Sequence, residues 1–248
     1  MSQDKKSIIN DPDLALDRYG NIFVITMRKA PENRLNTKYA RKIIRTFHKV
    51  RDLLGSSSEG AVITQGNDTK FWCTGLELDE TDTNPYANAE GFFPLLATIV
   101  SFPFPTIALI TGHTFGGACP FALSHDYRVM NSKRGFFCMP PVDLGLHFPG
   151  IGSLPRLKLH PQIARKMLLE AHRWTGEAAL KDGIVDAIAE PDKMFDVAME
   201  LARKWAPKAK MDVYGVLRSE LYGEANRHFR DVAYNYSQRP QPAAKAKI

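Results

Sequence analysis

The sequence has few cysteines, and their arrangement points neither to a disulfide nor to a metal site. Cys73, Cys119 and Cys138 are odd in number, lie far apart and sit in apolar sequence. Neither a disulfide framework nor the ligand spacing of a metal site is present. We therefore expect small buried thiols in a reducing compartment, with no bound metal.

A second absence concerns charge. The basic residues are spread along the chain, without the aromatic-interleaved basic run that nucleic-acid binding favours. Their surplus is moderate, with 33 Lys and Arg against 27 Asp and Glu and a net charge of +6. A surplus of this size suits binding of a phosphorylated small molecule, and an ordinary solvated surface explains it equally well. No nucleic-acid partner is expected.

Long apolar runs are also missing. The longest, residues 92–110, is interrupted by Pro94, Pro103 and Pro105 and is not a membrane span. The first 13 residues, MSQDKKSIINDPD, are polar, so no secretory signal is expected. A chain of 248 residues, 44% of them hydrophobic, is long enough for one large domain or for one domain with a C-terminal appendage.

The stretch 106–130, TIALITGHTFGGACPFALSHDYRVM, organises the rest of the chain. An apolar β-type run ends at a glycine turn, and Phe115-Gly116-Gly117 then opens a helix. Unpaired backbone N–H groups at such a turn suit an anion or a developing oxyanion. The alternative is that the paired glycines only let a strand and a helix pack closely. A second strand running into a glycine turn, at residues 71–79, favours the first interpretation.

Short strands alternate with helices, which predicts an α/β fold with a helical C-terminal part. A hairpin is expected around residues 19–21, followed by a helix that Asn36 or Thr37 caps. Pro161 divides 153–169 into two short helices. The acidic segment 79–88 is expected to be a loop or loose helix, and 140–152 a loop. The other expected strands are 61–64, 134–138 and 183–188, besides the strand and glycine turn at 71–79, and the other expected helices are 92–102, 175–180, 195–205 and 213–230.

Six stretches in order resemble the crotonase (enoyl-CoA hydratase/isomerase) superfamily. They are PENRL (31–35), AVITQG (61–66), FWCTGLEL (71–78), GHTFGGACPFALSHDY (112–127), GFFCMPPVDLGLHFPGIG (135–152) and TGEAALKDGIVDAI (175–188). The resemblance covers nearly all of residues 14–230. Within the superfamily, SHDY and PPVDLGL are most similar to the peroxisomal Δ3,Δ2-enoyl-CoA isomerases.

This resemblance implies an architecture. The fold expected is a crotonase-type spiral of ββα units over 1–188, followed by a helical trimerisation region at 189–238 and a basic tail at 239–248. A homotrimer, or a dimer of trimers, is implied. The last three residues, Ala246-Lys247-Ile248, have the small–basic–aliphatic pattern of a peroxisomal address, which an import receptor reads. The protein is therefore expected in peroxisomes, and otherwise in the cytoplasm.

The resemblance also implies an oxyanion hole made of two backbone N–H groups, which match Leu76 and Gly117. The substrate is then an acyl-CoA, with coenzyme A as part of the substrate and no separate cofactor. Two preorganised donors on a thioester enolate oxygen are each worth about 3 kcal/mol. The other residues expected to meet the substrate are Arg34, Leu35, Thr74, Gly75, Glu77 and Gly116.

The sequence departs from the family at the catalytic carboxylate. The three positions at which family members place it correspond here to Pro120, Pro141 and Pro149, and proline accepts no proton. His147 lies between the last two of these positions, and histidine is suited to proton transfer near neutral pH. His147, together with Asp143 or Glu77, is the candidate for that role. The alternatives are a surface or packing role for His147 and a structural role for Asp143.

Other polar residues near these motifs have competing interpretations. Glu77 and the acidic residues after it either face the pocket or form a solvated rim. His125 and Asp126 match a structural His-Asp-Tyr sequence beyond the pocket. The expected function is enoyl-CoA isomerisation or hydration in fatty-acid β-oxidation. The alternatives are a different reaction on a CoA ester, such as thioester hydrolysis or a step of secondary metabolism, and CoA binding without catalysis.

Overall fold

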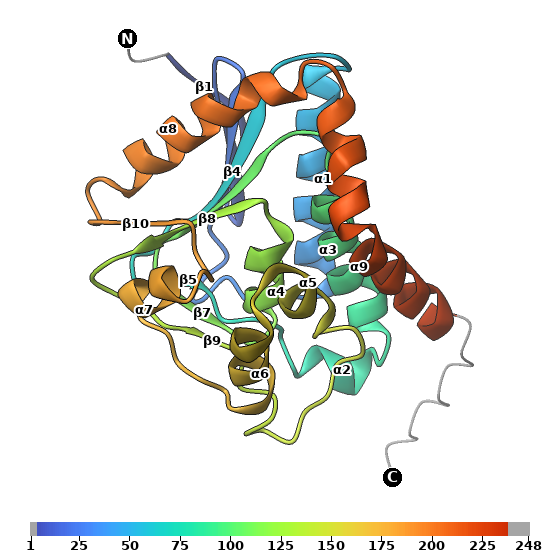
Figure 1. Cartoon of the computed structure of the whole chain (residues 1–248). Coiled ribbons are helices and arrows are strands. Elements are labelled where there is room, and N and C mark those ends of the chain that lie inside the picture. The colour runs from blue at the N-terminus through green and yellow to red at the C-terminus, as the bar shows by residue number, and fades with distance from the viewer. Residues whose placement is uncertain (1–3, 238–248) are drawn as a thin grey trace.

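The computed structural model describes residues 4–237. Its larger sheet is mixed and has seven strands (Figure 1). The strand order is β1-β2-β3-β4-β6-β8-β10. The first three strands are antiparallel, and those from β3 onward are parallel. The strands are β1 (Lys5–Asp11), β2 (Leu14–Tyr19), β3 (Ile22–Met27), β4 (Ala61–Gly66), β6 (Thr106–Ile110), β8 (Tyr127–Asn131) and β10 (Ala187–Ala189).

A smaller parallel sheet lies beside the first and contains β5 (Phe71–Cys73), β7 (His113–Phe115) and β9 (Phe137–Cys138). Each of these strands follows a strand of the large sheet, so that β4 and β5, β6 and β7, and β8 and β9 form successive pairs. A helical segment follows each pair. This repetition is the spiral of ββα units that the sequence predicts, and the α/β prediction with a helical C-terminal part is confirmed.

Helices cover both faces of the large sheet. On one face α8 (Met194–Trp205) packs against β4, β6 and β8. On the other face α1 (Thr37–Leu54), α3 (Phe93–Val100) and α9 (Val213–Ser237) lie side by side (Figure 1). The shorter helices are α2 (Glu80–Thr83), α4 (Ala118–Ser124), α5 (Ser153–Lys158), α6 (Pro161–Leu169) and α7 (Gly176–Lys181), with a π-helical turn at Asn88–Phe92 and a 3-10 turn at Ala206–Ala209.

The local signals place most elements correctly. The hairpin of β2 and β3 turns at the expected glycine, Gly20, which has a positive φ of 63°. Asn36 caps α1 because its side-chain oxygen accepts a hydrogen bond from the N–H of Tyr39 at 2.8 Å. Two short helices flank Pro161. Within the described residues no helix is long and apolar enough to cross a membrane.

Three strands do not follow from the sequence patterns. β1 consists of polar and half-exposed residues that pair with the edge of β2, so it carries no apolar alternation. β7 has only three residues, and β8 begins at the tyrosine of the His-Asp-Tyr sequence that follows α4. The strand predicted over 134–138 is limited to Phe137–Cys138, and the one predicted over 183–188 lies at Ala187–Ala189. The expected tail at 239–248 lies outside the described residues.

His125 is fully buried beyond α4 and has a structural role, as the sequence suggests. Its Nδ1 lies 3.0 Å from the carbonyl oxygen of Phe121 and its Nε2 lies 3.0 Å from the hydroxyl of Thr64. A carbonyl only accepts, so Nδ1 carries the proton and Nε2 accepts from the hydroxyl. Burial lowers the pKa of His125 to about 3, which keeps the ring neutral in the folded protein.

This burial predicts a loss of stability in mild acid. The pKa of an unfolded histidine is about 6.5, so below that pH the unfolded chain binds a proton that the folded chain does not. The free energy of unfolding is therefore expected to fall by about 2 kcal/mol between pH 6.5 and pH 5. Urea unfolding at several pH values measures this slope. His125→Gln should flatten it, and an equally steep slope in that variant would contradict the assignment to His125.

Candidate active site

The two glycine turns meet at one point of the structure, between β5 and the start of α4. Gly75 has a φ of 91°, and a side-chain carbon added to it would lie 2.7 Å from the carbonyl oxygen of Phe115 and 2.9 Å from the nitrogen of Gly117. Both distances are too short for any residue other than glycine. A carbon added to Gly117 would lie 3.0 Å from Cγ of Leu76. The structure thus brings together the two residues that the sequence predicts as a pair.

The backbone around these residues leaves two N–H groups without partners. On one side, Leu35 donates to the carbonyl of Gly75 at 2.7 Å and accepts from the N–H of Glu77 at 2.9 Å. On the other side, Gly116 donates to the carbonyl of Cys138 at 3.0 Å. Among the hydrogen bonds of residues 4–237, none uses the N–H of Leu76 or of Gly117. Two neighbouring N–H groups are therefore available to an external acceptor.

A small apolar cavity of about 90 Å³ adjoins these groups. Thr74 has the only polar side chain in the lining, and its hydroxyl donates to Oε2 of Glu32 at 2.8 Å. The lining residues are Thr74, Leu76, Leu78, Phe115, Gly116, Gly117, Pro140, Pro141, Leu144, Leu146 and Phe148.

The loop 140–152 closes one side of this cavity, and its residues alternate. Leu144, Leu146 and Phe148 line the cavity. His147 and Asp143, at intervening positions, are exposed and do not line it. The two residues predicted for proton transfer are therefore not part of the described lining, and their role stays a prediction.

The three prolines at the expected carboxylate positions lie in different surroundings. Pro120 is buried in the first turn of α4, where a missing N–H costs no helical hydrogen bond. Pro141 lines the cavity, and Pro149 is half-buried in the loop outside it. No lining residue carries a carboxylate, an imidazole or an amine. The described lining can hold and polarise a carbonyl group, but it offers no base.

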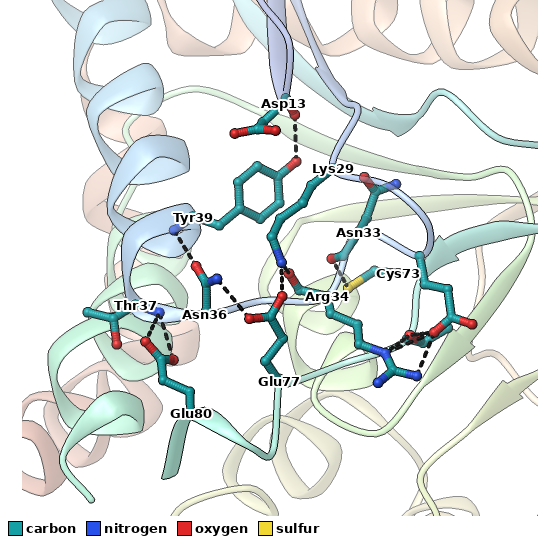
Figure 2. Close-up of polar contacts among 12 residues, drawn as sticks. Asp13, Lys29, Asn33, Arg34, Asn36, Thr37, Tyr39, Cys73, Glu77 and Glu80 are labelled. Atoms are coloured by element: carbon teal, nitrogen blue, oxygen red, sulfur yellow. Dashed lines mark hydrogen bonds and ion pairs between the residues drawn. The ribbon is translucent and has the colours of Figure 1, made fainter. Parts of the chain in front are cut away.

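Glu77 points away from the cavity. Leu76 and Leu78 line it, and the intervening Glu77 side chain faces the opposite side of the extended segment, as the alternation of a strand requires. There Glu77 forms an ion pair with Lys29 and accepts a hydrogen bond from Nδ2 of Asn36 at 2.8 Å (Figure 2). Glu77 is therefore not part of the described lining, and its role as a substrate contact stays a prediction.

Two other predicted substrate contacts, Leu35 and Arg34, also lie outside the lining. Leu35 is buried and forms a parallel bridge with Leu76, so it supports the site rather than lining it. Arg34 is exposed and forms an ion pair with Glu32 at 2.8 Å, with its Nε 3.3 Å from the hydroxyl of Thr74. The sequence reading missed Leu78, Phe115, Pro140, Leu144, Leu146 and Phe148. The loop 140–152 is irregular, so no fixed sequence period marks the last three.

The cysteines supply no reactive group. All three are free and buried. Desolvation raises the pKa of the Cys73 thiol to about 12 and raises that of Cys119 as well. A thiol in such a site is not a nucleophile. Among the described residues, no group of three or more His, Cys, Asp and Glu side chains could hold a metal ion.

The ββα spiral and the pair of free N–H groups define a class of fold and site that comparison with known proteins identifies. A family model described as enoyl-CoA hydratase/isomerase matches residues 17–232, and the chain belongs to this family, the crotonases. The crystal structure of an enoyl-CoA hydratase from Mycobacterium marinum superposes with a TM-score of 0.81. That pair is 22% identical and covers 91% of this chain and 98% of the other, which shows the fold.

Two kinds of curated relatives are similar over most of their length. Enoyl-CoA delta isomerase 2, peroxisomal, from Arabidopsis thaliana is 29% identical over 223 residues, which are 84% of this chain and 92% of that protein. Carnitinyl-CoA dehydratase from Salmonella agona is 28% identical over 228 residues, which are 90% of this chain and 85% of that protein. The family is thus established, and the relatives differ in the reaction that their names give.

Proposed function

We propose that this protein binds an acyl-CoA with the thioester oxygen between the N–H groups of Leu76 and Gly117, and shifts a 3-enoyl-CoA to its 2-enoyl isomer. The observation that carries the proposal is the pair of unpaired N–H groups beside an apolar cavity. Isomerase relatives support the choice of reaction. A role in fatty-acid β-oxidation follows from that reaction.

The chemistry rests on charge that develops at the thioester oxygen. Loss of a proton from C2 makes an enolate, and two fixed donors stabilise it by about 3 kcal/mol each relative to the ground state. The apolar lining excludes water and strengthens these hydrogen bonds. Since the described lining has no titrating side chain, the substrate itself or a water molecule carries the proton between C2 and C4. The product's conjugation with the carbonyl drives the shift.

The apolar lining also separates the two activities that the relatives' names give. A carnitinyl group carries a quaternary ammonium and a hydroxyl, which need a carboxylate or aromatic faces and a hydrogen-bond partner. The lining supplies two aromatic side chains, Phe115 and Phe148, but no carboxylate, and the hydroxyl of its one polar side chain, Thr74, already donates to Glu32, which leaves the substrate hydroxyl without a side-chain partner. An uncharged, apolar acyl group is therefore the substrate proposed.

A panel of CoA esters tests this function. Purified protein is expected to convert a 3-enoyl-CoA to the conjugated 2-enoyl form, followed by its ultraviolet absorption, and to leave carnitinyl-CoA unchanged. Hydration of a 2-enoyl-CoA or release of free CoA as the main activity would replace isomerisation by another reaction at the same site.

A second function has one observation in its favour, the absence of any base from the described lining. In this case the chain binds acyl-CoA without turnover. Calorimetric binding of an acyl-CoA with no conversion of any ester on the panel would establish it. Measurable turnover that Gly117→Val removes would exclude it.

The proposed homotrimer has a surface that fits it. Four apolar side chains on α9, Val213, Val216, Leu217 and Leu221, are each more than half exposed, and such a cluster is typical of an interface. Leu217→Glu combined with Leu221→Glu is expected to convert a trimer into monomers, because the charges would be buried unpaired. Light scattering during gel filtration measures the mass. An unchanged trimer in the double variant would place the interface elsewhere.

Peroxisomal localisation is proposed from Ala246-Lys247-Ile248 and is supported by relatives named as peroxisomal. These three residues lie outside the described part of the chain. Deleting them from an N-terminally tagged protein is expected to move it from peroxisomes to the cytosol, seen by microscopy. A full-length protein already in the cytosol would refute the assignment.

A further inference from the structure

The segment that carries Leu76 is held in place from one side by residues 32–36. The N–H of Leu35 donates to the carbonyl of Gly75, and the carbonyl of Leu35 accepts from the N–H of Glu77. Thr74 donates its N–H to the carbonyl of Glu32 at 3.1 Å, and Nδ2 of Asn33 donates to the carbonyl of Trp72 at 3.0 Å. These bonds fix which way the peptide of Leu76 faces. The direction of its N–H therefore depends on where residues 32–36 lie.

Two charged side chains tie these segments together on the face away from the cavity. Nζ of Lys29 pairs with Oε1 of Glu77 and also donates to the carbonyl of Arg34 at 2.9 Å (Figure 2). Oε2 of Glu77 accepts from Nδ2 of Asn36. The carboxylate of Glu77 thus contacts Lys29, which precedes Leu35 in the chain, and Asn36, which follows it.

The same tie reaches the start of an 18-residue helix. The Asn36 side chain, which contacts Glu77, also caps α1 through the N–H of Tyr39. The N–H of Thr37 donates to both carboxylate oxygens of Glu80, at 2.9 and 3.1 Å. A carboxylate at a helix N-terminus is favoured by the unpaired N–H groups and the helix dipole. The segment after Leu76 is therefore anchored to α1, a long and well-packed element.

We propose that Glu77 and Lys29 are positioning residues that hold the N–H of Leu76 in the direction the thioester oxygen requires. The inference rests on the proposed function, because it concerns the same pair of N–H groups. Neither side chain touches the cavity. The Lys29 side chain is only 19% exposed and that of Glu77 34%, so loss of one partner leaves a poorly solvated charge that displaces its neighbours. Desolvation lowers the pKa of Lys29, and the nearby Asp13 and Glu80 carboxylates oppose that shift.

This role makes a specific claim about kinetics. A donor that is displaced still lets the acyl-CoA bind, but it no longer lies where charge develops. Displacement of about 1 Å costs up to 10²-fold in rate. Glu77→Gln and Lys29→Met are each expected to lower kcat roughly 10- to 100-fold with KM nearly unchanged. A fold-stabilising pair without a positioning role would instead lower the melting temperature and leave the kcat of the folded protein unchanged.

The decisive readout is optical and does not depend on turnover. The probe is a CoA thioester of a conjugated aryl-enoyl acid, whose absorption moves to longer wavelength when hydrogen bonds polarise its carbonyl. Wild-type protein is expected to shift the band, and Glu77→Gln, Lys29→Met and the double variant to lose about half of the shift, because one of two donors is displaced. The matched control is Glu170→Gln, which removes the same charge from an exposed pair with Arg165.

The outcomes separate this inference from the proposed function. A full shift in Glu77→Gln and Lys29→Met, together with loss of the shift in Gly117→Val, overturns the positioning role and leaves the oxyanion hole intact. No shift in the wild-type protein with the probe bound overturns the oxyanion hole itself. A reduced shift in folded variants, with the wild-type shift in Glu170→Gln, supports the positioning role.

Discussion

Gly117→Val is expected to lower kcat/KM for a 3-enoyl-CoA on the order of 10³-fold, since one oxyanion donor is worth 10²- to 10³-fold and the new side chain also occupies the site. The first carbon of a side chain at this position already meets Leu76 at 3.0 Å and Phe92 at 3.4 Å. The further methyl groups of valine enter the space beside the free N–H groups. The φ of Gly117 is −57°, which valine adopts without backbone strain, so the fold is expected to persist.

The control for this substitution lies in α9. Gly223→Val makes the same chemical change, and a side-chain carbon added there meets only Nη1 of Arg227, at 3.6 Å. Steady-state kinetics and thermal unfolding of both variants separate loss of the site from loss of the fold. Near-wild-type turnover in a folded Gly117→Val protein would mean that the thioester oxygen binds elsewhere.

The parts of the site that sequence could predict are those made by the backbone. Gly75 follows from a glycine turn because no other residue fits the close approach of the two segments there. Leu76 and Gly117 are predicted as the two donors from the resemblance to the crotonase superfamily, and a backbone donor such as Leu76 is independent of its side chain. Short-range signals, such as the Asn36 cap and Pro161, also placed helix ends correctly.

The parts that sequence could not predict depend on partners distant in the chain or on side-chain direction in a loop. Glu77 is 48 residues from Lys29, and nothing in the local acidic run indicates that the two meet. His147 is a reasonable proton carrier by residue type, but the turn of 140–152 decides which of its residues face inward. An irregular loop has no fixed period for sequence analysis to use. The site is thus better defined in its electrostatics than in its acid–base chemistry.

The attachment of α9 also depends on residues distant in the chain. It involves the ion pair of Asp126 and Arg218, which are 92 positions apart. Nε of Arg218 lies 2.7 Å from Oδ1 of Asp126, as a close ion pair rather than a straight hydrogen bond. The side chains are 3% and 8% exposed. Arg218 also donates to the carbonyls of Phe102 and Ser124, and Asp126 accepts from the N–H and the hydroxyl of Thr106. The pair therefore joins the last helix to β6 and the end of α4.

Asp126→Ala is accordingly expected to destabilise the fold by about 3–5 kcal/mol, because it leaves the buried Arg218 guanidinium without its counter-charge. For a chain of this size that corresponds to a fall of roughly 10 °C in melting temperature, which calorimetry measures. Adding Arg218→Met should recover much of the loss, since removing both charges is far less costly than removing one. Asp52→Ala, which breaks an exposed pair with Arg51, is the control and is expected to cost less than about 1 kcal/mol. An effect of Asp126→Ala as small as that of the control would show that α9 is held by its apolar contacts alone.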